Sequence, residues 1–356
     1  MRYKDDWSKA KERLTAFWNG EIIDRCCVSI RACDWRKLGD SFRRPTERAE
    51  VDLFWTDPER IIRRNRLYME NTYYGGEAFP VMPLDLGASG HAGFFKGARH
   101  QFEGTVWFFP SWTGLENMEF DENSLLFSKT IGLARAFAED SRGDYMVSMP
   151  DCTGNADALA HLMGSEELLM QMVDEPETVH AALDRIGKSY ERAMNEVHAI
   201  TKDVNEGGGA IHWLNTWAPG FHAQMQCDMS VMISNPLFRE YILPELQSQC
   251  RFLEYPLYHF DGVEQLRHLD DILSIPELRV IQWTQVEGQP PATEYIPALQ
   301  KIQAAGKNLL LNALRPNQIR PLMENLSSKG LMLVMDAGTQ EEADSIIKEV
   351  ARRTHD

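Results

Sequence analysis

The feature that most constrains the fold is a repeating order, in which a short apolar run is followed by a helix-like pattern. Eight such runs, rich in branched aliphatic and aromatic residues, recur along the 356-residue chain. Strands that alternate with helices indicate a parallel sheet, and eight of them favour a closed (β/α)8 TIM barrel. No composition shift marks a boundary, so we expect a single domain over 1–356. The predicted strands span 26–32, 79–86, 145–151, 210–215, 255–261, 279–285, 308–313 and 331–336.

Helix signals lie between these runs. The segment 165–200 has helical periodicity and an acidic first turn, and Pro176 is expected to divide it into a short and a long helix. Asn235 followed by Pro236 predicts a helix start, with Asn as the N-cap and Pro at the first helical position. Pro244 lies inside that helix and should kink it.

One stretch, near 87–130, breaks the alternation. It is rich in glycine and aromatic residues and predicts an irregular insertion that contains a hairpin. His91 and His100 lie in this stretch. One interpretation makes them part of a lid over the site, and the other, which we favour, makes them solvated loop histidines.

Charge and cysteine content exclude several classes of protein. The chain has 37 Lys and Arg against 53 Asp and Glu, which gives a formal net charge of −16. Such a balance repels nucleic acids and anionic membranes. No apolar run approaches the length of about 18 residues that a membrane span needs. The six cysteines form no C-x-x-C pair, and we expect reduced thiols in a cytoplasmic protein.

A histidine and an aspartate end the fifth predicted strand. His259 and Asp261 are two residues apart, so their side chains should point to the same side. Both are Zn²⁺ ligands in proteins, and in a barrel the strand ends build the functional face. A third ligand would come from Asp336, Cys227 or Glu287. The alternatives are a base with its orienting carboxylate, or a buried structural histidine beside a turn.

Other strand ends offer further candidate residues. Asp228 follows the fourth strand as a candidate catalytic carboxylate, or as the cap of a turn. The sixth predicted strand carries Gln282 and the seventh ends at Asn312, and both residues would bind substrate. Cys152 precedes a helix start that would offer N–H groups to an anion, although a simple turn is the commoner role. Cys227 is expected to be a buried structural thiol, because no cation lies near it in the sequence.

Aromatic residues gather near the same strand ends. Trp217 and Trp283 are expected to line a substrate pocket, with core packing as the alternative for each. The wider group comprises Trp107, Trp112, Trp213, Trp217, Trp283 and Tyr258.

Four segments within about 140–350 carry a resemblance to a known family: "GSEELLMQMVDEPETVHAALDRI", "DMSVMISNPLFREYILPEL", "YHFDG" and "NALRP". Their order resembles that of the uroporphyrinogen decarboxylase superfamily, which contains porphyrinogen decarboxylases and corrinoid-linked methyltransferases. The chain would be a divergent member. The resemblance implies a (β/α)8 barrel and often a homodimer.

The site residues differ from the superfamily's motifs. The thiol methyltransferases bind zinc through His-x-Cys and a later Cys. His259 matches that histidine, Asp261 replaces the first cysteine, and Asp336 lies near the position of the second. The resemblance therefore implies a harder zinc site of His259, Asp261 and Asp336. The decarboxylases carry an N-terminal arginine motif, whereas this chain has only Arg31 and Arg36 in that region.

Three functional hypotheses follow. The first is an enzyme that transfers a methyl or one-carbon group from a small organic substrate to a corrinoid carried by a partner protein. His259, Asp261 and Asp228 would be catalytic in it, with Zn²⁺ as cofactor. The second is a decarboxylase without a cofactor, acting on uroporphyrinogen or another acid. The third is a non-catalytic ligand-binding barrel.

Overall fold

The centre of the molecule is a seven-stranded, mostly parallel β-sheet. The computed structural model describes residues 1–112, 118–286 and 288–355. The strand order is β2-β1-β13-β12-β11-β10-β9, and only β2 runs antiparallel to its neighbour. The strands are β1 (Cys27–Cys33), β2 (Thr72–Gly76), β9 (His222–Met225), β10 (Tyr255–Asp261), β11 (Val280–Thr284), β12 (Asn308–Leu311) and β13 (Leu331–Asp336).

Three two-stranded sheets complete the strand set of the described residues. The pair β3 (Val81–Met82) and β6 (Met146–Val147) is parallel. The other two pairs are antiparallel: β4 (Arg99–Phe102) with β5 (Val106–Phe109), and β7 (Gly209–Ile211) with β8 (Thr216–Ala218).

Each of the eight predicted strands therefore contains a real strand, but β3, β6 and β7 span only two or three residues. The prediction of one closed eight-stranded sheet is not met by the hydrogen-bonded strands described here. They form a mixed α/β fold around the seven-stranded sheet.

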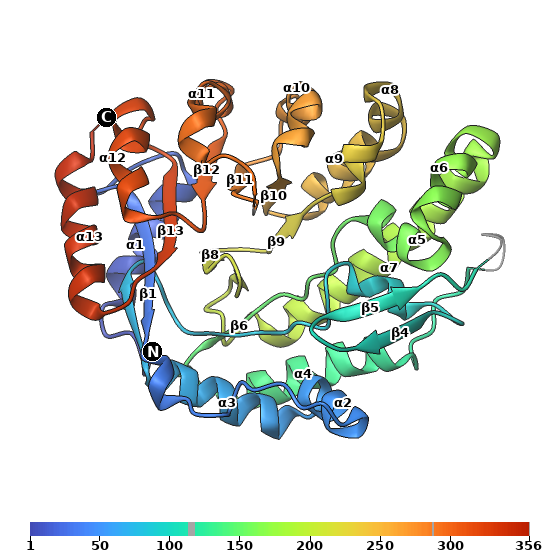
Figure 1. Cartoon of the computed structure of the whole chain (residues 1–356), viewed down its shortest axis with the longest axis horizontal. Helices are drawn as coiled ribbons and strands as arrows, with labels where there is room; N and C mark the ends of the chain where they lie inside the picture. Colours follow the sequence, from blue (N-terminus) through green and yellow to red (C-terminus); the bar gives the residue numbers. More distant parts are fainter. Residues whose placement is uncertain (113–117, 287, 356) are drawn as a thin grey trace.

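Helices cover the outer side of the sheet. In Figure 1, α9 to α13 lie outside the arc formed by β9 to β13. Helix α4 packs against α7 and against β6. The α-helices are α1 (Trp7–Trp18), α2 (Arg48–Thr56), α3 (Pro58–Glu70), α4 (Leu125–Ser141), α5 (Asn155–Met163), α6 (Ser165–Asp174), α7 (Pro176–Thr201), α8 (Asn235–Leu237), α9 (Leu243–Phe252), α10 (Leu269–Leu273), α11 (Ile296–Ala304), α12 (Pro316–Asn325) and α13 (Gln340–Arg353). Shorter turns are η1 (Trp35–Lys37), η2 (Gly90–Phe94), η3 (Asp228–Met232), η4 (Phe238–Ile242), η5 (Val263–His268) and η6 (Ala292–Tyr295).

The helix signals in the sequence are largely confirmed. Pro176 begins α7 directly after α6, as predicted. The helix that starts at Asn235 contains a π-helical turn, η4, just before Pro244, so the disturbance expected from that proline is present. The N-cap is Ser234 rather than Asn235.

Side-chain alternation along the strands builds two separate cores. Leu257, Val280 and Leu310 point into an inner core, whereas their neighbours Tyr258 and Ile281 point into an outer core beneath the helices. Residues of β3 and β6 divide in the same way. Period-2 alternation thus fills both faces of the sheet, which explains why the strands read as continuous apolar runs.

Helix α1 covers the amino-terminal ends of the strands. Its apolar side chains, among them Trp7 and Phe17, belong to the inner core. Asn308, the first residue of β12, donates its Nδ2 hydrogen to the carbonyl oxygens of Phe17 and Trp18, at 2.8 and 3.2 Å. One end of the inner core is therefore closed by a helix, and the carboxyl ends of the strands remain for a site.

The irregular insertion near 87–130 is confirmed and contains the β4–β5 hairpin. Residues 113–117 lie outside the described residues. His91 is fully buried, with its Nε2 3.2 Å from Asn155 Oδ1, so our preference for a solvated histidine was wrong there. No helix among the described residues is both long and apolar enough to span a bilayer.

The buried His222 generates a test of this arrangement. Its Nδ1 donates to the Tyr255 carbonyl oxygen at 2.7 Å, and its Nε2 lies 2.9 Å from Thr216 Oγ1, so it links β8, β9 and β10. Burial lowers the pKa of His222 from 6.5 to about 4. Between these values the unfolded chain binds the extra proton, so folding stability should rise with pH.

We predict that His222→Gln removes this pH dependence. As pH falls from 6.5 to 4, the unfolding free energy of the wild type should decrease relative to the variant by about 1.4 kcal/mol per pH unit. Urea denaturation of both proteins at several pH values measures the difference. Parallel curves would contradict the burial of a neutral imidazole.

Candidate functional site

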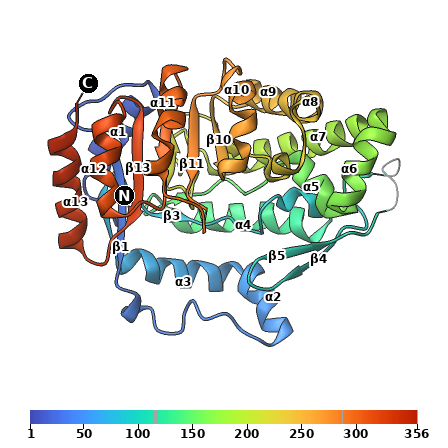
Figure 2. The same cartoon turned by 45° about the horizontal axis from the view of Figure 1, so that its top comes forward.

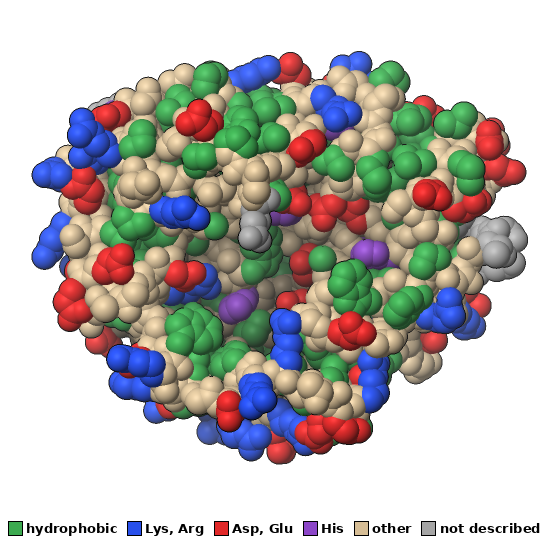
Figure 3. Space-filling model, in the orientation of Figure 1, with side chains coloured by type: hydrophobic (Ala, Val, Ile, Leu, Met, Phe, Trp, Pro, Cys, Tyr) green, Lys and Arg blue, Asp and Glu red, His purple; other side chains and the backbone are tan. Residues whose placement is uncertain are grey.

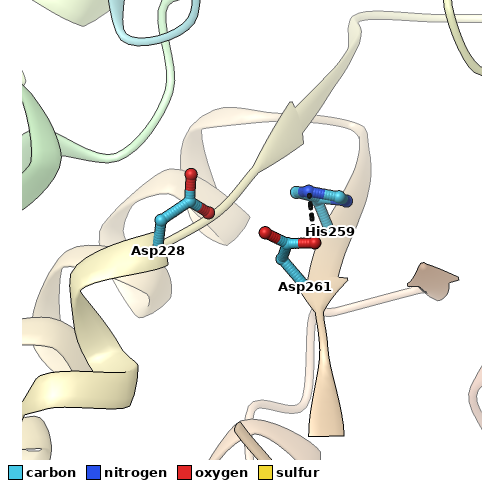
Figure 4. Close-up of side chains that lie close together, drawn as sticks. All are labelled: Asp228, His259 and Asp261. Atoms are coloured by element: carbon cyan, nitrogen blue, oxygen red, sulfur yellow. Dashed lines mark ion pairs between the residues drawn. The ribbon is translucent and has the colours of Figure 1, made fainter. Parts of the chain in front are cut away.

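Two carboxylates and an imidazole converge at the carboxyl end of β10. One ligand atom each from Asp228, His259 and Asp261 lies within 4.8 Å of the other two. His259 Nε2 is 3.8 Å from Asp261 Oδ1, and Figure 4 shows the three side chains facing a common point. His259 is buried, whereas Asp261 is half-buried and Asp228 reaches solvent. Their arrangement combines a fixed imidazole with accessible oxygen atoms.

Local structure explains how these three residues meet. His259 and Asp261 are alternate residues of β10, so they share its inner face as predicted. Asp228 arrives on η3, directly after β9, which pairs with β10. The Asp157 carboxylate accepts hydrogen bonds from the backbone N–H groups of Asp228 and Met229, at 3.0 and 2.8 Å, and so holds η3 in place.

Hydrogen bonding fixes the His259 ring. Its Nδ1 is 2.5 Å from Gln282 Oε1, and the Gln282 amide donates to Asn312 Oδ1 at 2.9 Å and to Thr284 Oγ1 at 2.8 Å. Because the amide oxygen can only accept, the proton is assigned to Nδ1 of His259. The Nε2 lone pair then faces Asp261. The ring edge also packs against Trp213, with ring centroids 5.0 Å apart.

The electrostatic environment of the site is strongly acidic. Burial raises the pKa of Asp228, and the charge of Asp261 raises it further while His259 lowers it. Although Asp228 reaches solvent, the walls around it remove enough water to have this effect. Burial also raises the pKa of Asp157 to about 7 and of Asp151 to about 8, with additional repulsion from Asp228 in both cases. Figure 3 shows acidic and histidine side chains in a central hollow.

These residues fit a divalent cation. Imidazole nitrogen and carboxylate oxygen are both ordinary Zn²⁺ ligands, and three protein ligands leave a position for substrate, as catalytic zinc sites do. Gln282 supplies the outer hydrogen bond that orients a metal-binding histidine. A cation between Asp228 and Asp261 would also remove their mutual repulsion.

The structure changes the predicted ligand set, because Asp336 is not part of this group. Its carboxylate lies 3.1 Å from Arg31 Nε, and both residues line a separate cavity of about 310 Å³ that also includes His212. In the group of side chains that lie close together, Asp228 is the third member, where the sequence analysis expected Asp336. Glu287 lies outside the described residues.

Three of the predicted substrate-binding residues lie in the cores instead. Trp217 packs on Trp7 of α1, at the end of the sheet opposite the site. Trp283 points outward and stacks on Phe260, with ring centroids 5.2 Å apart. Cys152 is buried in the outer core, where burial raises its thiol pKa. The structure thus places all three side chains in the cores, and their substrate-binding role stays a prediction.

The remaining predicted residues have other surroundings. Gln282 and Asn312 lie at the site, but they support His259. Cys227 is buried as expected, and its carbonyl accepts from Gln265 Nε2 at 3.0 Å. Arg36 pairs with Asp34 on the surface, at 2.8 Å.

Asp157 and Thr284 were missed from the sequence, whereas Trp213, which packs against His259, belongs to the aromatic group expected near the strand ends. For Thr284 a signal existed, because it follows Gln282 at the same two-residue spacing that joins His259 and Asp261.

Comparisons with known proteins support the fold. No protein-family model and no curated protein matches the chain. Among solved structures, the chain is similar to a methyltransferase from Methanosarcina mazei, with a TM-score of 0.63 and 13% sequence identity. The match covers 96% of this chain and 98% of that chain. At this identity the similarity shows a shared fold over the whole length.

The assigned His259 tautomer is directly testable. In ¹⁵N-correlated NMR spectra at neutral pH, the neutral ring of His259 should carry its proton on Nδ1, because Gln282 accepts it. Gln282→Leu should release this preference and destabilise the fold by about 1–3 kcal/mol, because His259 and Asn312 lose a buried partner. A neutral ring protonated on Nε2 in the wild type would contradict the assignment.

Proposed function

We propose that this protein is a methyltransferase that transfers a methyl group from a small organic substrate to a corrinoid carried by a partner protein. The observation that carries the proposal is the convergence of Asp228, His259 and Asp261 at the carboxyl end of β10. The similarity in fold to a methyltransferase and the sequence resemblance to corrinoid-linked enzymes both support it. In α/β folds with parallel strands, substrates bind at this end of the sheet.

Asp228, His259 and Asp261 would hold a Zn²⁺ ion. When bound, such an ion supplies Lewis acidity that stabilises negative charge on the heteroatom from which a methyl group departs. Gln282 keeps the His259 lone pair directed into the site, and Asp157 keeps Asp228 in place through the backbone of η3. Trp213 packs perpendicular to the imidazole of His259 and shields one side of it from water.

The ligand atoms favour a particular substrate class. One nitrogen and two carboxylate oxygens make a harder site than one containing thiolates. We therefore propose an oxygen- or nitrogen-bound methyl group as the substrate rather than a methyl thioether. The methyl group leaves without the bonding electron pair, which stays on the heteroatom, and cobalt supplies the pair for the new bond.

The cavity beside Asp336 does not suit the decarboxylation of a porphyrinogen. A polyanionic tetrapyrrole needs several cations around it. Among the described residues lining the cavity beside Asp336, Arg31 is the only Lys or Arg, and it is paired with that carboxylate.

We also propose that the sheet closes as a distorted barrel, through β3, β6 and β7. Met149 N donates to the Ala210 carbonyl at 2.7 Å, which links the segment after β6 to β7. Val81, Met146 and Ala210 share the inner core with residues of the large sheet. Both observations support a wall that continues around the inner core. A homodimer, as the resemblance implies, is part of the same proposal.

Metal content tests the site directly. We predict about one zinc per chain in the purified protein, and its loss in His259→Ala and Asp228→Ala, because each change removes one of three ligands. Asp336→Ala should retain the metal and serves as the matched control. Elemental analysis measures all four proteins. Zinc lost with Asp336 and kept without Asp228 would refute the ligand set.

Activity tests the reaction. Free cob(I)alamin can replace the partner protein in the assay. The enzyme should then form methylcobalamin from at least one member of a panel of methyl ethers and methylamines, and the absorbance of the cobalamin measures this reaction. Asp228→Asn should slow the reaction by about 100-fold or more, because a ligand of the ion that stabilises the departing heteroatom's charge is lost. Asp184→Asn, an exposed change on α7, should not. If the Asp228→Asn variant methylates cobalamin from these substrates as fast as the wild type does, the proposal is wrong.

A further inference from the structure

A second cavity, which none of Asp228, His259 and Asp261 lines, carries the opposite charge. It has a volume of about 690 Å³ and lies between α3 and the segment 41–45. Figure 2 shows this segment running alongside α3 before it reaches α2, and Figure 3 shows basic side chains gathered on the lower part of the molecule. The charged residues that line the cavity are Arg43, Arg60, Arg63, Arg64, Arg66 and Glu70.

This composition departs strongly from that of the whole chain. Acidic residues outnumber basic ones in the protein by 53 to 37, whereas five of these six charged side chains are arginines. The one carboxylate, Glu70, has a cation of its own, since Arg2 lies 3.7 Å away. A local excess of positive charge in an acidic protein would attract an anion to this place.

Only part of this positive charge is neutralised by the protein. Arg60 pairs with Glu50 at 2.5 Å, and Arg66 pairs with Asp140 at 2.7 Å. Arg43 and Arg63 are exposed. Among residues 1–112, 118–286 and 288–355, no carboxylate oxygen lies within 4.0 Å of the guanidinium groups of Arg43, Arg63 and Arg64.

Arg64 is the most informative member. Its guanidinium lies 4.0 Å from the centre of the Phe54 ring and donates to the Phe54 carbonyl oxygen at 2.7 Å. Burial lowers its pKa to about 10, with no acidic group that opposes the effect. A half-buried cation without a counter-ion is costly, and an anion in the cavity would offset that cost.

From this geometry we propose that the arginine cavity binds a small, multiply charged oxyanion, with a phosphorylated molecule as the best match. Guanidinium groups bind phosphate oxygens through paired hydrogen bonds, and Arg43, Arg63 and Arg64 have donors to spare. The volume lies in the range of small-molecule sites and exceeds the size of one phosphate group. Phe54, Pro45 and Leu67 supply an apolar wall for the rest of the ligand.

The site is independent of the methyltransferase proposal. None of its lining residues belongs to the triad of Asp228, His259 and Asp261 or bonds to it.

Calorimetric titration of the full-length protein with pyrophosphate tests the proposal. We expect saturable binding at one site per chain that weakens as salt increases. Arg64→Gln and the double variant Arg43→Gln, Arg63→Gln should each weaken it by about tenfold or more, which corresponds to about 1.4 kcal/mol. The double variant alters only exposed residues, so it keeps the test valid if Arg64→Gln does not fold. Arg251→Gln, an exposed arginine on α9, is the charge-matched control and should bind as the wild type does.

Each remaining outcome is decisive. Tighter binding of citrate than of pyrophosphate, lost in the same variants, would keep the oxyanion site and identify polycarboxylates as its ligands. Absence of pyrophosphate and citrate binding, or equal binding by wild type and all variants, would overturn the proposal. Binding of hexaglutamate alone would overturn it in favour of a docking surface for an acidic protein segment.

Discussion

The hydrogen-bond register between β10 and β11 is the constraint on which the site depends. It places His259 opposite Gln282, and Asp261 opposite Thr284. A slip of one residue would turn every side chain of the strand to the other face. Tyr258 and Phe260 would then enter the acidic hollow, and His259 would be buried beneath the helices. The apolar residues that alternate with the site residues therefore fix the site by occupying the outer core.

The order of the strands in the sheet decides which residues of this site can be predicted from the sequence. Two-residue spacing identified His259 and Asp261, because both lie on one strand. The third carboxylate could not be chosen in this way, since Asp228 and Asp336 both follow strand ends. In the sheet, β9 is next to β10, whereas β13 is three strands away. At a spacing of about 4.8 Å per strand, the strand that carries Asp336 lies about 14 Å along the sheet from the strand that carries His259. Only tertiary structure supplies that order.

The two tryptophans predicted to bind substrate lie in the cores for different reasons. Trp283 follows Gln282 directly, so if one faces the site the other must face the helices. Alternation alone was therefore sufficient to exclude it. Trp217 lies on β8, which folds back against β7 before β9 begins. The sequence signal for that excursion was a long loop, and nothing in its composition indicated that the tryptophan would pack against α1.

Electrostatics favours a cation site over a simple acid–base pair. With the proton of His259 held on Nδ1 by Gln282, the atoms that face one another are a nitrogen lone pair and the oxygens of Asp228 and Asp261. Three acceptors without a donor repel one another in a partly dehydrated hollow. One shared proton would join only two of them, whereas a divalent cation attracts all three at once. The charge of Asp228 also raises the pKa of the nearby Asp157, so a cation bound in the hollow would relieve that repulsion as well.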